Sequence, residues 1–413
     1  MPAPRPRNHL PAARGSAPPP RRVVVLGSTG SIGVNALAVV EHLTRTGQRP
    51  FEVVGLAAGS DARTLAAQAT QFNCPNVALA DADAARNLSA ARVFAGPDAA
   101  RQLVEHTRPD VVVAAIVGVA GLPATVQAVE QGCTVALANK ETLVAAGGLV
   151  MPLAERTGVT LLPVDSEHSA VFQCLAGADA DKAVRRVVLT ASGGPFRDTP
   201  PEVFNDATPE QALKHPTWDM GPKITVDSAT MMNKALEVIE AHHLFGLPPE
   251  LIEVVVHPQS IVHGFVEFAD HSVVAQLGPP DMRTPIQVAL TWPDRVPGCS
   301  DRLDWSKLSR LDFQPPDGER FPALKLAYRV VRSQDNPETA STGAIFNAAN
   351  EVAVEAFLER RIRFGRIVEL VAEALDAVPA TPIHTLDDVT AADAAARDAV
   401  RQRLRDASAP ATA

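Results

Sequence analysis

The stretch 21-RRVVVLGSTGSIGVNALAVV-40 decides the fold. A run of β-branched residues ends at Gly27, and Gly30 and Gly33 lead directly into an apolar-periodic helix. Glycines permit a tight turn and a close approach of the backbone, and the start of a helix favours a pyrophosphate. The spacing GxxGxxG differs from the usual GxGxxG, and a plain tight turn is the alternative. At the first strand-to-helix turn of a repeating pattern, the loop predicts dinucleotide binding.

Short strands alternate with helices on the C-terminal side of this loop. β-rich runs lie at 51–57, 110–117 and 134–138, and a further run at 161–164 closes this pattern or opens the next part. The alternation predicts an α/β fold with a Rossmann-like, doubly wound parallel sheet, in a nucleotide-binding domain over 22–164.

The rest of the chain changes character twice. Three consecutive strands at 251–278 predict an antiparallel meander in a central α+β catalytic domain, 165–300. The Pro-rich stretch of about 193–223, which carries Trp218, predicts a lid loop over that domain. After a linker at 301–325, four apolar-periodic segments predict a C-terminal helical bundle over 326–413.

Composition and charge exclude several classes of protein. The 413 residues are 46% hydrophobic and carry a net charge of −9 without a long basic run, so no nucleic-acid partner is expected. The most hydrophobic window, 111–129, is broken by Gly118, Gly121 and Pro123, which argues against a membrane span. Four scattered cysteines suit a reducing cytoplasm. Residues 1–21, acid-free and rich in Pro and Arg, predict a disordered tail.

Carboxylates gather where the strand 161-LLPVDSE-167 ends. In an extended chain Asp165 and Glu167 point the same way, with Cα atoms roughly 6.6 Å apart. A helix predicted over 228–246 adds Glu237, with Asn233 and Lys234 on the same stripe. Three carboxylates without grouped Cys or His suit Mg²⁺ or Mn²⁺ better than zinc. A Lys234–Glu237 surface salt bridge beside a capping aspartate explains the same spacing equally well.

Two strand ends bear on the cofactor. Asn139, Lys140 and Glu141 follow the strand taken as the fifth, and should face the crevice at the carboxyl ends of the strands unless they form an exposed helix start. The second strand runs into Gly59 and Ser60, with Asp61 later than the usual ribose-binding acid and Arg63 close by. This arrangement favours NADP over NAD.

Eight segments together resemble the 1-deoxy-D-xylulose 5-phosphate reductoisomerase family. The resemblance runs in order over about residues 22 to 400, and its segments are GSTGSIG, ALANKETLV, PVDSEHSAVFQ, SGGPFRD, HPTWDMGPKITVDSATMMNK, HPQSIVHG, LGPPDMRTPIQVAL and FNAANEVAVEAF. It implies conversion of 1-deoxy-D-xylulose 5-phosphate, a small phosphorylated sugar, to 2-C-methyl-D-erythritol 4-phosphate in non-mevalonate isoprenoid synthesis. It also implies NADPH, a divalent cation (Mg²⁺, Mn²⁺ or Co²⁺), a homodimer and a cytoplasmic enzyme.

The resemblance assigns site residues by position. Those matching the metal ligands are Asp165, Glu167 and Glu237. Catalytic roles fall to Lys140, Glu167, His215 and Glu237. Substrate contacts fall to Lys140, Ser166, Glu167, Ser192, His215, Ser228, Asn233, Lys234 and Glu237. Cofactor positions are Thr29, Gly30, Ser31, Ile32, Gly59, Ser60, Asp61, Asn139, Glu141 and Gly221.

The chain departs from the family at two places, and two rival functions fit the sequence less well. Ser60-Asp61 stands where many members have a basic residue and an Asn, and Pro222 stands where a basic residue is common. An aspartate-semialdehyde dehydrogenase-like enzyme would need a catalytic cysteine, and none of the four has a convincing setting. An inactive NAD(P)-binding redox regulator would need a partner-binding module, and the sequence has no helix-turn-helix or basic patch.

Overall fold

The computed structural model describes residues 19–176, 183–218 and 220–408. The predicted tail, 1–21, lies outside the described residues as far as residue 18, and Arg21 already begins the first strand. Among the described residues, no helix is long and apolar enough to cross a membrane.

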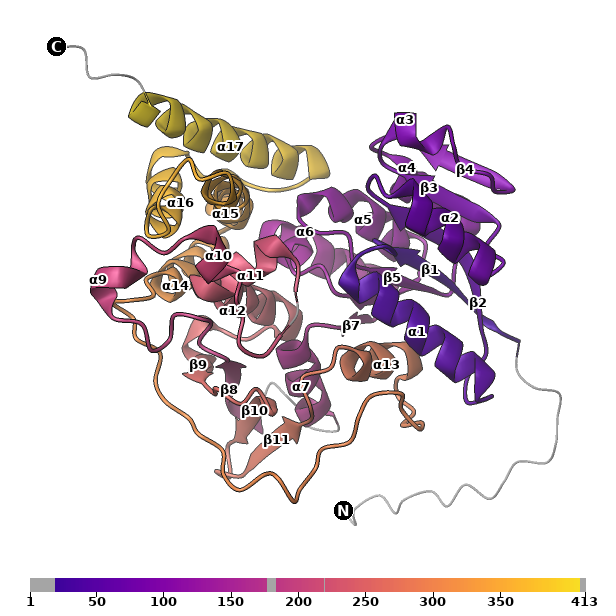
Figure 1. The fold of residues 1–413 in the computed structure, drawn as a ribbon, viewed down its shortest axis with the longest axis horizontal. Helices are drawn as coiled ribbons and strands as arrows, with labels where there is room; N and C mark the ends of the chain where they lie inside the picture. The colour runs from indigo at the N-terminus through magenta and orange to yellow at the C-terminus, as the bar shows by residue number, and fades with distance from the viewer. Residues whose placement is uncertain (1–18, 177–182, 219, 409–413) are drawn as a thin grey trace.

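A seven-stranded parallel sheet forms the N-terminal part, in the order β4-β3-β2-β1-β5-β6-β7 (Figure 1). Its strands are β1 (Arg21–Leu26), β2 (Phe51–Ala58), β3 (Asn76–Leu79), β4 (Arg92–Ala95), β5 (Val111–Ala114), β6 (Thr134–Leu137) and β7 (Leu161–Pro163). The strand order turns back between β1 and β5, so the sheet is doubly wound as predicted. The run at 161–164 closes this sheet as its edge strand.

Two of these strands escaped the sequence pattern. Strand β3 is only four residues long, although three of them are buried and apolar, and β4, equally short, has no buried residue, so neither run was long enough to stand out. Asn139 and Lys140 therefore follow the sixth strand rather than the fifth.

Alternate side chains of each central strand enter two separate cores. Val23 and Val25 of β1 pack on one face with α1 (Ser31–Arg45), α2 (Ala62–Gln71) and α13 (Arg283–Thr291). Val24 and Leu26 pack on the other face with α4 (Ala99–Thr107), α5 (Leu122–Glu130) and α6 (Glu141–Thr157). Both faces are covered because a parallel sheet needs crossover helices on each side. Short helices α3 (Ala82–Ala85) and η1 (Val119–Gly121) complete this part.

A second sheet of four strands lies beside α7 (Ser166–Leu175). Its strands are β8 (Val184–Ala191), β9 (Ile252–Val256), β10 (Val262–Phe268) and β11 (Val273–Leu277), in the order β11-β10-β8-β9. The predicted meander is wrong at one step, because β9 pairs in parallel with β8 instead of with β10. Strand β8 comes from more than 60 residues earlier and inserts between them, which short-range spacing could not show.

The predicted helix over 228–246 is two helices. Helix α11 (Pro222–Ala229) ends at Thr230, and α12 (Met232–Phe245) starts after Met231, whose φ of 60° is left-handed. The predicted lid contains two short helices, α9 (Pro201–Phe204) and α10 (Pro209–Ala212).

The C-terminal part is helical, as predicted. Its elements are α14 (Ala323–Gln334), η3 (Pro337–Thr339), α15 (Thr342–Leu358), α16 (Arg366–Ala377) and α17 (Leu386–Ser408). The short helix η2 (Pro249–Leu251) belongs to the second sheet, directly before β9. Helix α15 packs against α16, α17 and α6, so it lies between the C-terminal helices and the seven-stranded sheet (Figure 1). The stretch predicted as a linker, 301–325, pairs with the second sheet at one point, where Gln314 bridges to Val256. The linker is also shorter than predicted, because α14 already begins at Ala323.

Candidate active site

The glycine loop divides its three glycines between the fold and the cavity. A Cβ at Gly27, where φ is +78°, would lie 2.4 Å from the carbonyl oxygen of Ala115, and one at Gly33 would lie 2.2 Å from that of Gly27. Close backbone packing therefore requires both. A Cβ at Gly30 would meet only the Gly27 oxygen, at 3.4 Å, and Gly30 lines the cavity with Ser31 and Ile32. The loop thus leaves room for a cofactor phosphate at the start of α1.

Asn139 connects two loops at the carboxyl edge of the sheet. Its Nδ2 donates to the carbonyl oxygen of Gly118 at 2.8 Å, and its Oδ1 accepts from the amide of Thr142 at 3.0 Å. The side chain is buried, so both hydrogen bonds are shielded from water. Lys140 and Glu141 follow it into the first turn of α6 and also line the cavity.

The three predicted metal ligands converge. Oxygen atoms of Asp165, Glu167 and Glu237 all lie within 4.8 Å of one another. The expected extended geometry is wrong, because Asp165 directly precedes α7 and Glu167 lies in its first turn. The start of that helix, with Glu237 of α12, brings the carboxylates together instead. Three hard oxygen donors at this spacing fit a cation such as Mg²⁺ or Mn²⁺.

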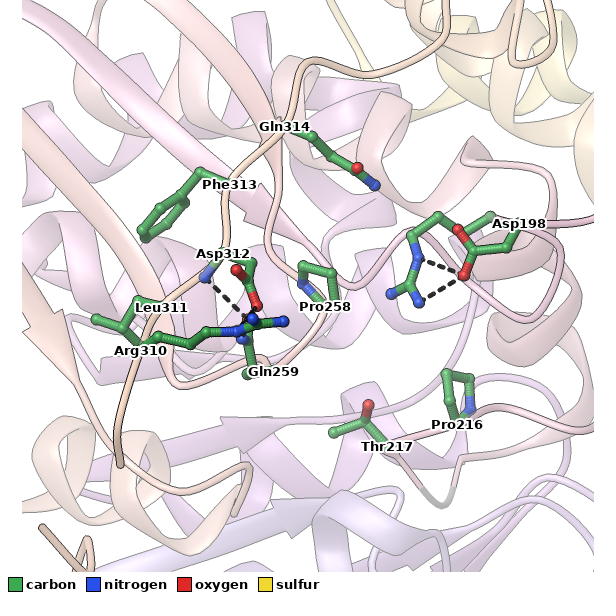
Figure 2. Close-up of a pocket in the computed structure, with 11 residues that line it drawn as sticks. Asp198, Pro216, Thr217, Pro258, Gln259, Arg310, Leu311, Asp312, Phe313 and Gln314 are labelled. Atoms are coloured by element: carbon green, nitrogen blue, oxygen red, sulfur yellow. Dashed lines mark hydrogen bonds and ion pairs between the residues drawn. The ribbon is translucent and has the colours of Figure 1, made fainter. Parts of the chain in front are cut away.

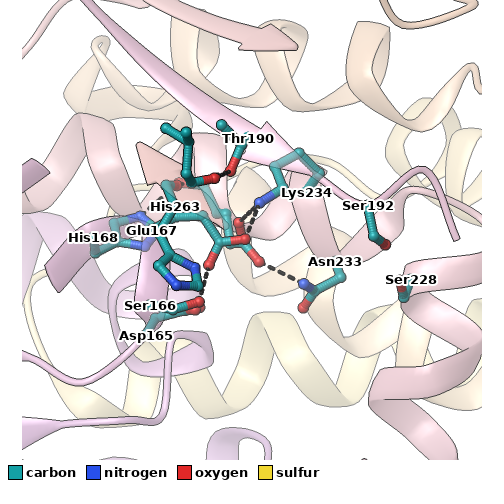
Figure 3. A network of polar contacts seen from close by, with 12 residues as sticks. Asp165, Ser166, Glu167, His168, Thr190, Ser192, Ser228, Asn233, Lys234 and His263 are labelled. Atoms are coloured by element: carbon teal, nitrogen blue, oxygen red, sulfur yellow. Dashed lines mark hydrogen bonds and ion pairs between the residues drawn. The ribbon is translucent and has the colours of Figure 1, made fainter. Parts of the chain in front are cut away.

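Two buried lysines meet the carboxylates. Lys140 Nζ contacts Asp165, lies 3.1 Å from Glu237 Oε1 and donates to Asn233 Oδ1 at 2.9 Å. Lys234 Nζ lies 2.6 Å from Glu167 Oε1 and contacts Glu237 (Figure 3). Lys234 and Glu237 are 4% and 1% exposed, so their pair is no surface salt bridge. Three carboxylates against two ammonium groups leave one negative charge for a cation to offset.

Burial and mutual repulsion shift the pKa values of this cluster. Burial, together with the charge of Glu167, raises the pKa of Glu237 to about 7. Burial alone would raise the pKa of Asp165, but the nearby Lys140 lowers it. For Lys140 burial acts downward, and the charges of Asp165 and Glu237 raise its pKa well above the usual value. Glu237 is therefore the carboxylate that gains most from a bound cation.

A cluster of hydroxyl and imidazole groups lies beside the carboxylates. His215 Nε2 is 3.1 Å from both Ser192 Oγ and Ser228 Oγ. Its Nδ1 accepts from the backbone amides of Thr217 and Trp218, so in the neutral ring the proton is on Nε2. Burial lowers the pKa of His215. The cluster can donate several hydrogen bonds to an anionic group.

One cavity of about 400 Å³ joins these parts. The predicted site residues that line it are Gly30, Ser31, Ile32, Asn139, Lys140, Glu141, Asp165, Ser166, Glu167, Ser192, His215, Gly221, Ser228, Asn233, Lys234 and Glu237. Trp218 of the predicted lid also lines it, with its ring 6.2 Å from that of His263.

The remaining predicted cofactor residues lie outside that lining. Thr29 belongs to the glycine loop, while Gly59, Ser60 and Asp61 form an exposed turn after β2. Asp61 caps α2 by accepting from the amide of Thr64 at 3.0 Å, and these hydrogen bonds lower its pKa. A Cβ at Gly59 would meet nothing within 4 Å, which leaves space for a ribose phosphate.

A second pocket lies at the base of the lid (Figure 2). Lid residues 197–198 and 216–217 line one side of it, and residues 310–314, from the stretch predicted as a linker, line another. Its charged side chains are already paired, Arg197 with Asp198 at 2.7 Å and Arg310 with Asp312 at 3.1 Å. Gln259 donates to Asp312 at 2.6 Å. We assign no function to it.

Several cavity residues escaped the sequence analysis. Lys223 of α11 lies 3.1 Å from Glu141 Oε1 and 3.0 Å from Asp227 Oδ2. The i,i+4 spacing of Lys223 and Asp227 was visible in the sequence, but it is equally typical of an exposed helix. Two further missed residues, His168 and Glu240, do not line the cavity but form a fully buried pair behind the carboxylates, 3.4 Å apart. Nothing in their local sequence marks them as buried.

Comparisons with known proteins agree over most of the chain. The sequence profile described as 1-deoxy-D-xylulose 5-phosphate reductoisomerase matches residues 23–147. Two profiles described as C-terminal domains of that enzyme match 161–245 and 277–399. The reductoisomerase of Chlorobium chlorochromatii is 50% identical over 93% of this chain and 100% of its own length. That of Pelodictyon phaeoclathratiforme is 49% identical over 92% and 99%.

Solved structures give the same result. The Zymomonas mobilis reductoisomerase in complex with NADPH superposes with a TM-score of 0.84, at 44% identity, over 93% of this chain and 98% of that one. A DOX-P reductoisomerase in complex with NADPH, fosmidomycin and magnesium has a TM-score of 0.85 at 36% identity, again over 93% and 98%.

A doubly wound sheet whose glycine loop shares one cavity with a carboxylate cluster defines a nicotinamide-dinucleotide- and metal-dependent enzyme. The sequence identities to the reductoisomerases, together with the share of each chain that is matched, narrow this class of enzyme to one family. The chain belongs to the 1-deoxy-D-xylulose 5-phosphate reductoisomerase family.

Proposed function

We propose that the protein converts 1-deoxy-D-xylulose 5-phosphate to 2-C-methyl-D-erythritol 4-phosphate, the committed step of non-mevalonate isoprenoid synthesis. The observation that carries this proposal is the single cavity shared by the glycine loop, the three carboxylates and the hydroxyl–imidazole cluster. Relatives of that name, and a relative's structure with NADPH, fosmidomycin and magnesium, support it.

Asp165, Glu167 and Glu237 are the proposed metal ligands. A bound divalent cation would polarise the carbonyl and hydroxyl oxygens of the substrate for rearrangement, and NADPH would supply the hydride that reduces the product aldehyde. Two of these carboxylates lie at the start of α7 and the third lies on α12. Ser166 donates to Glu167 Oε2 at 2.5 Å. That hydrogen bond fixes the orientation of the Glu167 carboxylate.

Lys140 and Lys234 supply positive charge on the substrate side of the cluster. Lys140 reaches Asp165 and Glu237 from the position directly before α6, so it is placed to stabilise oxyanion charge that develops nearby. Asn233 orients that ammonium group by accepting one of its hydrogen bonds.

The substrate phosphate is proposed to bind among Ser192, His215, Ser228, Asn233 and Lys234. These side chains offer hydroxyl, imidazole, amide and ammonium donors. His215, with its proton on Nε2, donates toward the phosphate in the neutral state, because its Nδ1 is already occupied by two backbone amides.

The cofactor is proposed to lie along the carboxyl edge of the seven-stranded sheet. Thr29, Gly30, Ser31 and Ile32 surround the pyrophosphate position, while Gly59, Ser60 and Asp61 face the ribose phosphate. Asn139, Glu141 and Gly221 lie toward the nicotinamide end, where the cavity meets the carboxylates.

We also propose three domains, at 22–164, 165–300 and 326–413, and assembly as a homodimer in the cytoplasm. The four cysteines are free among the described residues, which supports a reducing compartment. These assignments and the residue roles above stay predictions.

The alternative, an inactive redox-sensing regulator, is disfavoured because a complete set of three carboxylates and two lysines persists in the cavity. The test is NADPH oxidation, followed by absorbance, with 1-deoxy-D-xylulose 5-phosphate and Mg²⁺ or Mn²⁺. We expect oxidation only when substrate and metal are both present. NADPH binding without any turnover would support the regulator.

A further inference from the structure

The motif 346-FNAANEVAV-354 lies on α15, outside the cavity, and has no role in the proposed chemistry. Helix α15 is almost wholly buried, and three of its buried side chains are polar or charged. Asn347 and Asn350 are 0% exposed, and Glu351 is largely covered. Buried polar side chains are costly unless they are partnered, so the partners of this motif indicate what it does.

Asn350 reaches the helix that follows the lid. Its Nδ2 donates to Asp227 Oδ1 on α11 at 2.8 Å. The other oxygen of Asp227 lies 3.0 Å from Lys223 Nζ, which in turn lies 3.1 Å from Glu141 Oε1. This hydrogen-bonded chain runs from α15 through α11 to the first residue of α6, and Asp227 is only 1% exposed.

Glu351 reaches the loop after β5. A Cβ at Gly118, where φ is +72°, would lie 2.6 Å from Glu351 Oε1, so the carboxylate packs directly on this loop. Asn347 donates to the same oxygen at 3.0 Å, and Arg397 of α17 contacts the other. The carbonyl of Gly118 accepts from Asn139, and the adjoining Val117 lines the cavity.

The charge of Glu351 also acts on the first chain. Burial alone would lower the pKa of Lys223, but Asp227, Glu141 and Glu351 together raise it. The motif therefore contacts both walls of the cofactor crevice, one formed by α11 and the other by the Gly118 loop. Two of the residues involved line the cavity: Gly221, which directly precedes α11, and Glu141, which is the last member of the hydrogen-bonded chain from Asn350.

We propose that Asn347, Asn350 and Glu351 are positioning residues that hold α11 and the Gly118 loop in the arrangement that binds NADPH. The C-terminal helices then set the affinity of a site that they do not line. This inference rests on the proposed function only in taking NADPH as the ligand.

The test is fluorescence titration of the full-length protein with NADPH, without substrate or metal. For Asn350→Ala we expect the Kd for NADPH to rise about tenfold, because α11 loses its tie to α15. The matched control is Val352→Ala, a 1% exposed position in the same helix. Its Tm should fall as much or more, while its Kd stays within about twofold of the unaltered chain.

Two further variants keep the test decisive. Glu351→Gln preserves shape but removes the charge beside Gly118 and Lys223, so it carries the test if Asn350→Ala does not fold; we expect a smaller rise in Kd. Asn350→Asp places a carboxylate against Asp227 and should be worse than Asn350→Ala. Adding Asp227→Asn to it restores an amide–carboxylate pair and should recover most of the affinity.

The outcomes separate two failures. If the unaltered chain does not bind NADPH, the proposed function itself fails. If it binds NADPH and turns over substrate, but Asn350→Ala and Glu351→Gln bind NADPH equally well, the motif is only a packing element and the positioning role is wrong.

Discussion

Glu237 is 1% exposed and lies between Lys140 and Lys234, close to two other carboxylates. A carboxylate in this position serves a cation best when ionised, yet burial and Glu167 oppose its ionisation. Because these effects oppose each other, the ionisation of Glu237 should respond more strongly to pH and to a bound cation than that of the other two carboxylates.

Replacing Glu237 with Gln should abolish most of the activity. The amide keeps the size of the side chain but loses the charge that draws the cation, so we expect turnover to fall on the order of a hundredfold or more at saturating metal. NADPH binding, measured separately by fluorescence, should stay intact. Near-normal turnover of this variant would remove Glu237 from the metal site.

Cation binding should depend on pH through the same residue. Because the pKa of Glu237 is raised to about 7, the metal-free folded protein holds a proton that the unfolded chain has already lost at that pH. This group's contribution to stability is therefore present at low pH and declines as the pH rises toward about 7.

Metal binding must displace that proton, so the affinity for Mn²⁺ should rise up to about tenfold per pH unit and level off above about pH 7. Calorimetric titration with Mn²⁺ between about pH 6 and about pH 8 measures this. The Glu237→Gln variant is the control and should lose most of the slope. A flat profile in the unaltered chain would contradict the assignment.

We expect cofactor choice to depend on the exposed turn at Ser60-Asp61. In this proposal Asp61 opposes a ribose phosphate, whereas Arg63, exposed in the first turn of α2, approaches it. We expect NADPH to be preferred over NADH, by a smaller margin than in relatives with a basic residue here. Asp61→Asn, which still caps α2, should tighten NADPH about fivefold and leave NADH unchanged, and Arg63→Ala should weaken NADPH selectively.

Steady-state KM values for both cofactors in the three proteins measure these effects. A sharp loss of NADH binding in Asp61→Asn would instead make Asp61 the ribose ligand of an NAD enzyme.

At the scale of elements, the break between α11 and α12 places the site. The left-handed Met231 costs about 1–2 kcal/mol relative to a continuous helix, and the hydroxyl of Thr230 accepts from the amide of Met232 at 3.3 Å. The break lets α11 present Ser228 to the hydroxyl–imidazole cluster while α12 presents Glu237 to the carboxylates.

The lid should close over bound ligands. Trp218 is half-buried against His263 at the cavity, so its fluorescence should change when NADPH, Mg²⁺ and fosmidomycin are added together. Trp292, packed on Phe172 at 4.7 Å, and Trp305, 70% exposed, are background emitters. The control is Trp218→Phe, and an unaltered signal change in that variant would remove the evidence for closure.

At the scale of the whole molecule, the second sheet exposes apolar side chains. Val273 and Val274 of the edge strand β11 are 56% and 44% exposed, and Phe313 beside this sheet is 47% exposed. An edge strand that exposes such residues is suited to pairing with a second copy of the chain. Light scattering should therefore give twice the chain mass of 43.6 kDa. Val273→Lys should shift the mass toward one chain, and a single-chain mass for the unaltered protein would contradict the dimer.

Local sequence patterns were enough to predict much of the fold. The strand–glycine–helix unit around Gly27, the alternating strands of the first sheet and the C-terminal helices follow from periodicity and turn residues, which act over a few neighbours. Strands β3 and β4 were missed because four-residue strands are too short to show such a pattern, and β4 in addition has no buried residue. The pairing of β9 with β8 was missed because it joins residues far apart in the chain.

The sequence by itself determined the residue types of the site: two carboxylates after one strand, a third on a helix, and lysines near both. It left open whether Lys234 and Glu237 form a surface pair or part of a metal site, because spacing reports only neighbours on one helix. The tertiary structure excludes the surface pair, because it buries both side chains and brings Lys140 and Asp165 to them from separate elements, while the metal site stays a prediction. It also decided that the motif at Asn350 reaches α11, since such contacts exist only once α15 packs between the two parts of the molecule.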